Sequence, residues 1–206
     1  MTPPSEPRTF TEAARRAQLI GSAIEAVNEL GYAGASLSAI ARRAHVAKSA
    51  IVYYFGTKDS LMSALMDHVF ARMGESIVAA VEAHTTAAEQ LRAYVTAFLT
   101  HTGRYRSEVT AGVAVAVAHR DSSGVPAYLA HEEDDTAPLR QILRAGIDEG
   151  SFRDLDVAHA AEAVEAVLDV AVTTVQRDPD ANLEKLGEEL MRFIAQGLSS
   201  CSPEAA

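Results

Sequence analysis

Apolar residues recur at helical spacing along almost the whole chain, and this period limits the fold more than any other feature. Near the N-terminus, Ile20, Ile24, Val27 and Leu30 fall on one face of a helix. Similar stripes follow over 61–81, 91–99, 164–175 and 183–198. No two segments have the alternation and turn residues of a hairpin, and no segment repeats. The pattern predicts an all-α fold, with a head of three helices followed by a body of about six.

Composition limits the class of protein. The chain has 206 residues, 48% of them hydrophobic, which is typical of a soluble globular protein. Its single cysteine, Cys201, excludes an intrachain disulfide. The first ten residues do not resemble a signal peptide, and uncharged runs such as 109–119 are only about half the length that spans a bilayer. These features predict a cytoplasmic protein.

The charge is unevenly distributed along the chain. The total is −10, which argues against a nucleic-acid partner. Residues 1–60, however, contain seven Lys or Arg and five Asp or Glu, so they carry +2 and the remainder carries −12. A slightly basic head on an acidic body is therefore compatible with an anionic partner for the head.

The segment "HVAKSAIVYYFGTKDSL", residues 45–61, contains the β-branched and aromatic run "IVYYF". By propensity alone this run could be a strand. Helical spacing divides it more cleanly, because Ile51 and Phe55 lie four residues apart on one side. Lys48, Ser49 and Tyr53 lie on the opposite side. We therefore predict a short helix with an apolar inner face and a polar outer face.

The preceding helix completes a second pattern. "LSAIARRAHVAKSAIVYYF" has the length and spacing of a helix-turn-helix with its turn at Ala44 to Val46. In that motif the second helix enters the major groove of DNA, which is about 12 Å wide. The predicted DNA-binding residues are Ser36, Ser38, Lys48, Ser49, Ala50, Val52, Tyr53, Tyr54 and Lys58. Arg42 and Arg43, with Arg15 and Arg16, would add to the cationic field. The alternative is a three-helix core with a solvated basic face.

At base edges, Lys48 can donate to guanine O6 and N7, Ser49 can contact either base, and Ala50 or Val52 can contact a thymine methyl. Tyr53, Tyr54 and Lys58 are placed to reach phosphate oxygens, and Ser36 would do so from the flank.

The segment "SLSAIARRAHVAKSAIVYYFGTKDSLMSAL" resembles the DNA-binding signature of the TetR family of bacterial transcriptional regulators. The strong resemblance covers roughly residues 10–66; "LRAGIDEGSFRDLDVAHAAEAV" also resembles a stretch of that family's body. The resemblance implies a disordered arm at 1–9, a helix-turn-helix domain at 10–56, and an effector-binding and dimerisation domain at 57–206. It implies a homodimer that binds a palindromic operator, most often as a repressor, and that a small-molecule effector releases from it.

Three residues depart from the family's usual pattern. His45 stands where the turn commonly has Gly, Ala47 stands where a Ser usually caps the recognition helix, and Val52 replaces a Tyr that often contacts DNA. We predict a positive φ at His45, because His is among the non-glycine residues that tolerate the left-handed region. A missing cap typically costs about 1 kcal/mol. Val52 makes a phosphate contact at its position doubtful.

In the body, the last two helices have broad apolar stripes, which could pair with a second subunit as a four-helix bundle or pack within one chain. The predicted dimer interface consists of Val164, Leu168, Val172, Val175, Leu186, Leu190, Phe193 and Ile194. The predicted effector pocket is an apolar cavity with a few polar groups. Its candidate residues, most of which are expected to be ordinary core, are Met62, Met66, Met73, Tyr94, Phe98, Tyr105 and Tyr128.

The sequence shows no catalytic constellation. It has no phosphate loop, nucleotide-binding glycine motif, nucleophile elbow or metalloprotease motif. His68, His84, His101 and His119 have no convincing metal-ligand spacing, and the acidic cluster at 132–135 is typical of a solvated helix start. We therefore predict no enzymatic activity, no metal and no cofactor. The alternative to a DNA-binding regulator is an all-α adaptor whose head contacts another protein.

Overall fold

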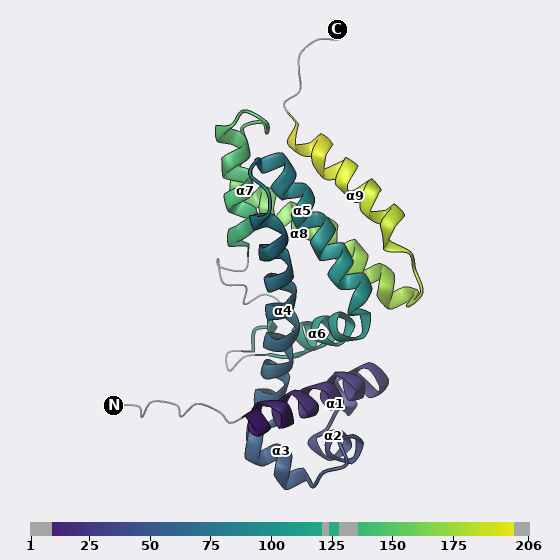
Figure 1. The fold of residues 1–206 in the computed structure, drawn as a ribbon. Helices are drawn as coiled ribbons and strands as arrows, with labels where there is room; N and C mark the ends of the chain where they lie inside the picture. Colours follow the sequence, from purple (N-terminus) through teal and green to yellow (C-terminus); the bar gives the residue numbers. More distant parts are fainter. Residues whose placement is uncertain (1–9, 121–123, 128–135, 200–206) are drawn as a thin grey trace, which may run out of the picture. The chain divides into compact units, whose positions relative to one another are not determined.

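The computed structural model describes residues 10–120, 124–127 and 136–199. The predicted arm at 1–9, Tyr128, the acidic cluster at 132–135 and Cys201 lie outside these residues. The described residues form nine helices, drawn in Figure 1: α1 (Phe10–Gly34), α2 (Leu37–Arg43), α3 (Lys48–Phe55), α4 (Lys58–Glu82), α5 (Ala87–Arg104), α6 (Arg106–Ala118), α7 (Ala137–Asp148), α8 (Val157–Arg177) and α9 (Leu183–Leu198). Apart from one isolated bridge between Arg120 and Pro126, these residues form no β-structure. The predicted all-α fold is confirmed.

The chain forms two compact units. The N-terminal unit comprises Met1–Val69 and Ala111–Leu129, and the C-terminal unit comprises Phe70–Thr110 and Ala130–Ala206. The long helix α4 and the helix α6 each contribute residues to both units.

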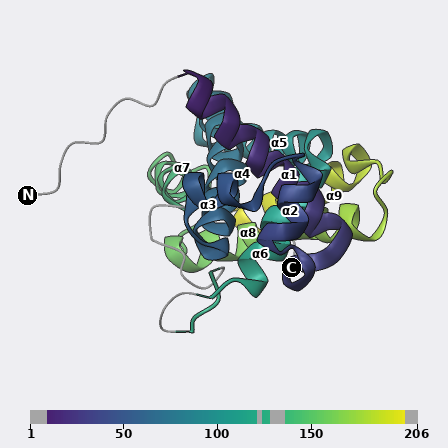
Figure 2. The same cartoon turned by 90° about the horizontal axis from the view of Figure 1, so that it is seen from below.

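In the N-terminal unit, α2 packs against α1 and α3, as Figures 1 and 2 show. The predicted inner face of the short third helix is confirmed, because Ile51 and Phe55 are buried. The core of this unit also includes Leu19, Ile40 and Leu61, which have no exposed surface. The run "IVYYF" is helical rather than extended.

Gly31 and Thr57 mark two helix boundaries in this unit. Gly31 has φ 69° and ψ 169°, so regular helical geometry in α1 ends at this glycine. Thr57 precedes α4, and its hydroxyl accepts a hydrogen bond from the Ser60 amide at 3.0 Å. That bond satisfies one of the free amides at the start of the helix.

In the C-terminal unit, α5 packs against α7, α8 and α9. Fully buried leucines from these elements fill the core: Leu139, Leu143 and Leu168. Thr86, Asp156 and Asn182 cap α5, α8 and α9 through their side-chain oxygens. Pro138 lies in the first turn of α7, where a proline is tolerated.

A glycine is required near the end of α7. The Phe152 ring lies against Gly146, and a Cβ at that position would overlap the ring. The amide groups of Ser151 and Phe152 both donate to the Gly146 carbonyl, each at 2.9 Å, which turns the chain back onto the helix.

Candidate DNA-binding surface and cavities

The start of α2 is fixed by a side-chain cap. Ser36 has an extended backbone, and its hydroxyl oxygen accepts a hydrogen bond from the Ala39 amide at 3.2 Å. Ser36 and Ser38 are exposed. Both predicted residues therefore lie at the surface where the free amides of the helix start are available to an anion.

The turn between α2 and α3 has the geometry of a Schellman motif. His45 has φ 54°, which confirms the predicted positive φ. The Val46 amide donates to the Ala41 carbonyl at 3.0 Å, and the His45 amide donates to the Arg42 carbonyl at 3.3 Å. These two bonds satisfy the last carbonyls of α2 and set the direction in which α3 leaves the turn.

The outer face of α3 is open to solvent. Tyr53 is 82% exposed and Val52 is 44% exposed, and Lys48 and Ser49 are also exposed. Ala50 is half-buried. The structure therefore brings the predicted base-reading residues together on one surface. Ala47 begins the helix without a side-chain cap, as predicted.

An arginine of α1 fixes the end of α3. The Arg16 guanidinium lies 4.2 Å from the centre of the Phe55 ring and donates a hydrogen bond to the Tyr54 carbonyl. The Tyr54 side chain is half-buried, and its ring meets that of Tyr53 edge-on at 5.0 Å. Arg16 therefore holds the recognition helix in place through contacts within the unit.

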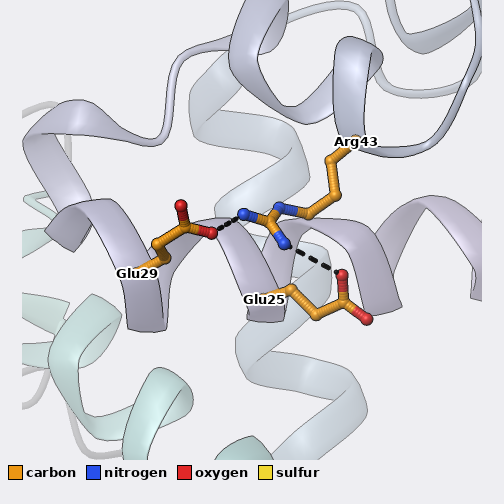
Figure 3. A network of polar contacts seen from close by, with 3 residues as sticks. All are labelled: Glu25, Glu29 and Arg43. Carbon is orange, nitrogen blue, oxygen red and sulfur yellow. Dashed lines mark hydrogen bonds and ion pairs between the residues drawn. The ribbon is translucent and has the colours of Figure 1, made fainter.

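Arg43 is also engaged within the unit. Its guanidinium binds both Glu25, at 3.4 Å, and Glu29 of α1 (Figure 3). These carboxylates offset the positive charge of Arg43, so it adds less to the field of the head than the sequence suggests. Arg42 is exposed and forms no ion pair with the described side chains, so its charge is available to a partner.

Lys58 makes an internal contact that the sequence did not indicate. Its ammonium donates to the Tyr32 carbonyl at 2.6 Å and lies 4.4 Å from the centre of the Tyr32 ring. The Tyr32 hydroxyl in turn lies 3.1 Å from Nδ1 of the buried His119. Partial burial and the negative charge of Asp59 raise the pKa of Tyr32. A phosphate contact by Lys58 would have to replace its bond to Tyr32.

The predicted pocket residues are distributed over the two units. Met62 and Met66 belong to the N-terminal unit, where Met62 is fully buried in the core. Met73 and Tyr94 are buried in the C-terminal unit, and the Tyr94 hydroxyl donates to Glu165 at 3.3 Å. Burial, followed by the charge of Glu165, raises the pKa of Tyr94. Met62, Met73 and Tyr94 therefore belong to the core. Helical spacing in the sequence could not reveal this, because it does not distinguish a side chain packed in the core from one that lines a cavity.

The C-terminal unit contains two cavities of about 590 Å³ each. One lies between α5, α9 and the segment that precedes α9. Arg106, at the start of α6, and Leu183, at the start of α9, also line it. Arg106 closes one side of it by donating to the carbonyls of Pro179 and Ala181, each at 2.7 Å. The other lies along α4 and α5, and Tyr105 is the predicted pocket residue that lines it.

Sequence reasoning missed most residues that line the α4–α5 cavity. Ser76, His101 and Arg104 contribute polar groups, and several alanines contribute the apolar surface. Ser76 and His101 are polar residues near the apolar stripes of two long helices, and this position was the only sequence feature that could have indicated them. The sequence does not show which faces of the two helices meet. Among the described residues, no cluster of His, Cys, Asp and Glu could hold a metal ion.

The predicted dimer residues fall into two groups. Val164, Leu168, Val172, Val175 and Ile194 are buried within the C-terminal unit, so their side chains pack inside one chain. Leu186 and Leu190 are half-buried, and Phe193 is 64% exposed. Because α8 and α9 also pack against each other and α5, one side of each stripe is used internally. The apolar surface left for a partner includes Phe193 on α9 and Val170 on α8.

No helix in the described part of the chain combines the length and the apolar character needed to cross a bilayer.

Comparison with known proteins identifies relatives of the N-terminal unit. Residues 19–65 match the family described as "Bacterial regulatory proteins, tetR family". The HTH-type transcriptional regulator BetI of Burkholderia thailandensis is 38% identical over 88 residues, which are 40% of this chain and 43% of that protein. BetI of Paraburkholderia phytofirmans is 44% identical over 55 residues, 27% of this chain and 28% of that protein. The match thus spans less than half the length of these regulators.

The fold extends the similarity over nearly the whole chain. The fatty acid degradation regulator FadR from Bacillus halodurans superposes with a TM-score of 0.78 at 23% identity, covering 93% of this chain and 98% of that one. The TetR-family regulator PfmR from Thermus thermophilus gives a TM-score of 0.74 at 21% identity, covering 88% and 99%. FadR from Bacillus subtilis, solved in complex with stearoyl-CoA, gives 0.72 at 24% identity, covering 88% and 98%. At these identities the likeness shows a shared fold.

Proposed function

We propose, from the match of residues 19–65 to the TetR family of bacterial regulators, that this chain is a transcriptional regulator acting as a repressor. It binds a palindromic DNA operator as a homodimer, and a small-molecule effector lowers its affinity for that operator. It acts in the cytoplasm, where the operator and the effector are both available.

The observation that carries this proposal is the outer face of α3. Lys48, Ser49 and Tyr53 are exposed together on one side of the helix, while Ile51 and Phe55 anchor its other side in the core. A helix held in this way fits the major groove and presents hydrogen-bond donors to base edges. Ser36 and Ser38 at the start of α2 supply phosphate contacts that orient the motif.

A homodimer gives this small surface enough reach. One recognition helix contacts only a few base pairs, whereas two heads related by a two-fold axis read a palindrome with half-sites about one helical turn apart. The exposed Phe193 on α9 and Val170 on α8 support pairing through these helices.

Effector control acts through a difference in affinity. An effector that binds more tightly to a conformation with poor operator affinity shifts the population toward it. The two cavities of the C-terminal unit are large enough for a small molecule. B. subtilis FadR, which shares the fold, is known in complex with stearoyl-CoA. That example supports a ligand-responsive body here.

Substitutions on the outer face of α3 test the proposal. We expect Lys48→Ala and Tyr53→Ala each to weaken binding to an operator selected from genomic DNA by about tenfold or more, because base and phosphate contacts are lost. Fluorescence anisotropy over a series of salt concentrations measures the affinity, and log K should fall as salt rises.

Lys185→Ala is the matched control, since Lys185 is an exposed lysine on α9, outside the head. It should leave operator affinity near that of the unsubstituted protein. If Lys48→Ala and Tyr53→Ala both bind like the unsubstituted protein at moderate salt, the recognition face is assigned wrongly.

A further inference from the structure

The α4–α5 cavity has a chemical gradient along its length. α4 and α5 follow each other in the chain with a short connection, 83–86, and residues of both line the cavity. One end contains polar groups of Ser76, His101, Arg104 and Tyr105. The middle is lined by alanines together with Thr96 and Thr100, and His84, Glu89 and Arg92 lie toward the α4–α5 connection. The cavity therefore has a polar end and a mainly apolar body.

Alanines make the surface in the middle of the cavity mainly apolar. Ala80, Ala93 and Ala97 line this part. Along α5, eight residues separate His101 from Ala93, which corresponds to about 12 Å at the helical rise. This length suits an extended aliphatic chain of about eight to ten carbons. Alanine side chains leave room for a ligand but do not select its chemistry. The class of ligand is therefore set by the polar groups at the end of the cavity.

The hydrogen bonds of Ser76 fix the tautomer of His101. The Ser76 hydroxyl donates its one proton to the Met73 carbonyl at 2.8 Å. His101 Nδ1 lies 3.1 Å from the same hydroxyl oxygen, so Nδ1 carries the proton and donates to it. In the neutral ring, Nε2 then has a lone pair and can only accept a hydrogen bond.

Burial favours the neutral form of the His101 ring, and the described residues offer no partner to its second nitrogen. Burial, and then the positive charge of Arg72, lower the pKa of His101, while Glu108 raises it. The side chain is 6% exposed, and among the described residues Nε2 has no hydrogen-bond partner. A hydrogen-bond acceptor on a residue that lines a cavity, with no protein donor of its own, favours a ligand with a hydrogen-bond donor.

The charges around the polar end select the sign of the ligand. Arg72 is paired with Glu108 at 2.5 Å, so its charge is offset. Arg104 is exposed and has no ion pair among the described side chains; its guanidinium lies 5.4 Å from the centre of the Tyr105 ring. At the other end of the cavity, the negative charge of Glu89 balances the positive charge of Arg92. The unbalanced charge is therefore that of Arg104, next to a phenol that can donate a hydrogen bond.

We propose that the α4–α5 cavity binds a hydroxylated aliphatic carboxylic acid. The carboxylate pairs with Arg104 and accepts a hydrogen bond from Tyr105, the ligand hydroxyl donates to His101 Nε2, and the aliphatic chain lies along Ala97, Ala93 and Ala80. The ligand's role as the effector rests on the proposed function, but its binding does not.

Isothermal titration calorimetry of the full-length protein with matched probes tests the assignment. The probes are 3-hydroxydecanoate, decanoate and decyltrimethylammonium. We expect 3-hydroxydecanoate to bind about threefold to tenfold more tightly than decanoate, because only the hydroxy acid satisfies His101. The cation should bind least, because Arg104 repels it. Equal affinities for the two acids, tighter binding of the cation, or no binding of any probe would overturn the proposal.

Two variants at tolerant positions locate the site. Arg104→Gln should weaken binding of both acids about threefold to tenfold, and Ala97→Leu should abolish binding by filling the middle of the cavity. Arg144→Gln and Ala79→Leu are the matched controls, because both residues are exposed and neither lines the cavity. They should leave binding unchanged. If Arg104→Gln and Ala97→Leu bind the acids like the unsubstituted protein, the ligand is not in this cavity.

The positioning of the hydroxyl has its own readout. His101→Gln keeps an acceptor and should retain part of the preference for 3-hydroxydecanoate, whereas His101→Leu should remove the preference while decanoate still binds. A preference that survives in His101→Leu would contradict the role of His101.

Failure of this inference can be distinguished from failure of the proposed function. Operator binding without acid binding rejects the ligand assignment and leaves the DNA-binding role intact. Acid binding without any sequence-specific DNA binding supports the cavity assignment and rejects the regulator.

Discussion

Thr102 on α5 is a buried polar residue without a hydrogen bond. It has no exposed surface, and its hydroxyl oxygen is the side-chain atom in the described part of the chain that is buried without a partner. A buried hydroxyl that lacks a partner loses its hydrogen bonds to water and regains none on folding. Most buried polar groups in native proteins avoid this cost.

We predict that Thr102→Val raises the free energy of unfolding by about 1 kcal/mol, because valine has nearly the same shape without the hydroxyl. Urea denaturation followed by circular dichroism measures the change. Thr173→Val on α8 is the matched control, since Thr173 is exposed and should change stability little. A loss of stability in Thr102→Val would mean that the hydroxyl has a partner in solution.

Other residues show where sequence reasoning succeeds and where it ends. The positive φ of His45 was predictable, because the turn length of the motif dictates a left-handed residue. The contact between Lys58 and Tyr32, 26 residues apart, was not. Nothing local in a sequence shows which distant carbonyl a lysine will reach, and the same holds for Arg43 with Glu25 and Glu29.

At the scale of the element, α2 and α3 differ in how they begin. Ser36 caps α2, whereas α3 starts at Ala47 with no side-chain cap. The recognition helix is only eight residues long, so an uncapped start affects a large part of it.

We predict that Ala47→Ser stabilises the protein by about 1 kcal/mol, because the serine hydroxyl can accept a hydrogen bond from a free amide of the first turn. Ser36→Ala should produce a similar change of opposite sign, since it removes an existing cap. Thermal unfolding of both variants beside the unsubstituted protein measures the two effects. If Ala47→Ser has no effect while Ser36→Ala destabilises, the start of α3 is already satisfied by other groups.

The positions of the helices could be predicted from the sequence, but the face that each helix buries could not always be predicted. On α3 the inner and outer faces were predicted correctly, because its apolar stripe is narrow. On α8 the stripe is broad, and Val164, Leu168, Val172 and Val175 proved to pack within the unit. A broad stripe fixes the helical period but leaves open which neighbour covers each part of it. The α4–α5 cavity escaped prediction for a similar reason, since its lining comes from two helices.

At the scale of the whole molecule, the proposed function makes DNA affinity depend on residues that lie outside the DNA-binding surface. The proposed operator is a palindrome, so two heads must bind together, and the second head contributes only if the subunits stay associated. Association is proposed to occur through α8 and α9, where Phe193 leaves most of its ring exposed. Exposed aromatic side chains of this kind often contribute strongly to the free energy of association.

We therefore predict that Phe193→Ser converts the dimer to monomer at micromolar concentration and weakens operator binding at least tenfold, although the recognition surface is unchanged. Sedimentation velocity measures the association state, and fluorescence anisotropy on the same samples measures DNA affinity. Val117→Ser is the matched control: Val117 is also more than half exposed but lies on α6. It should leave both quantities unchanged. A Phe193→Ser protein that remains dimeric would place the subunit interface elsewhere, and a monomer that keeps full operator affinity would show that one head suffices.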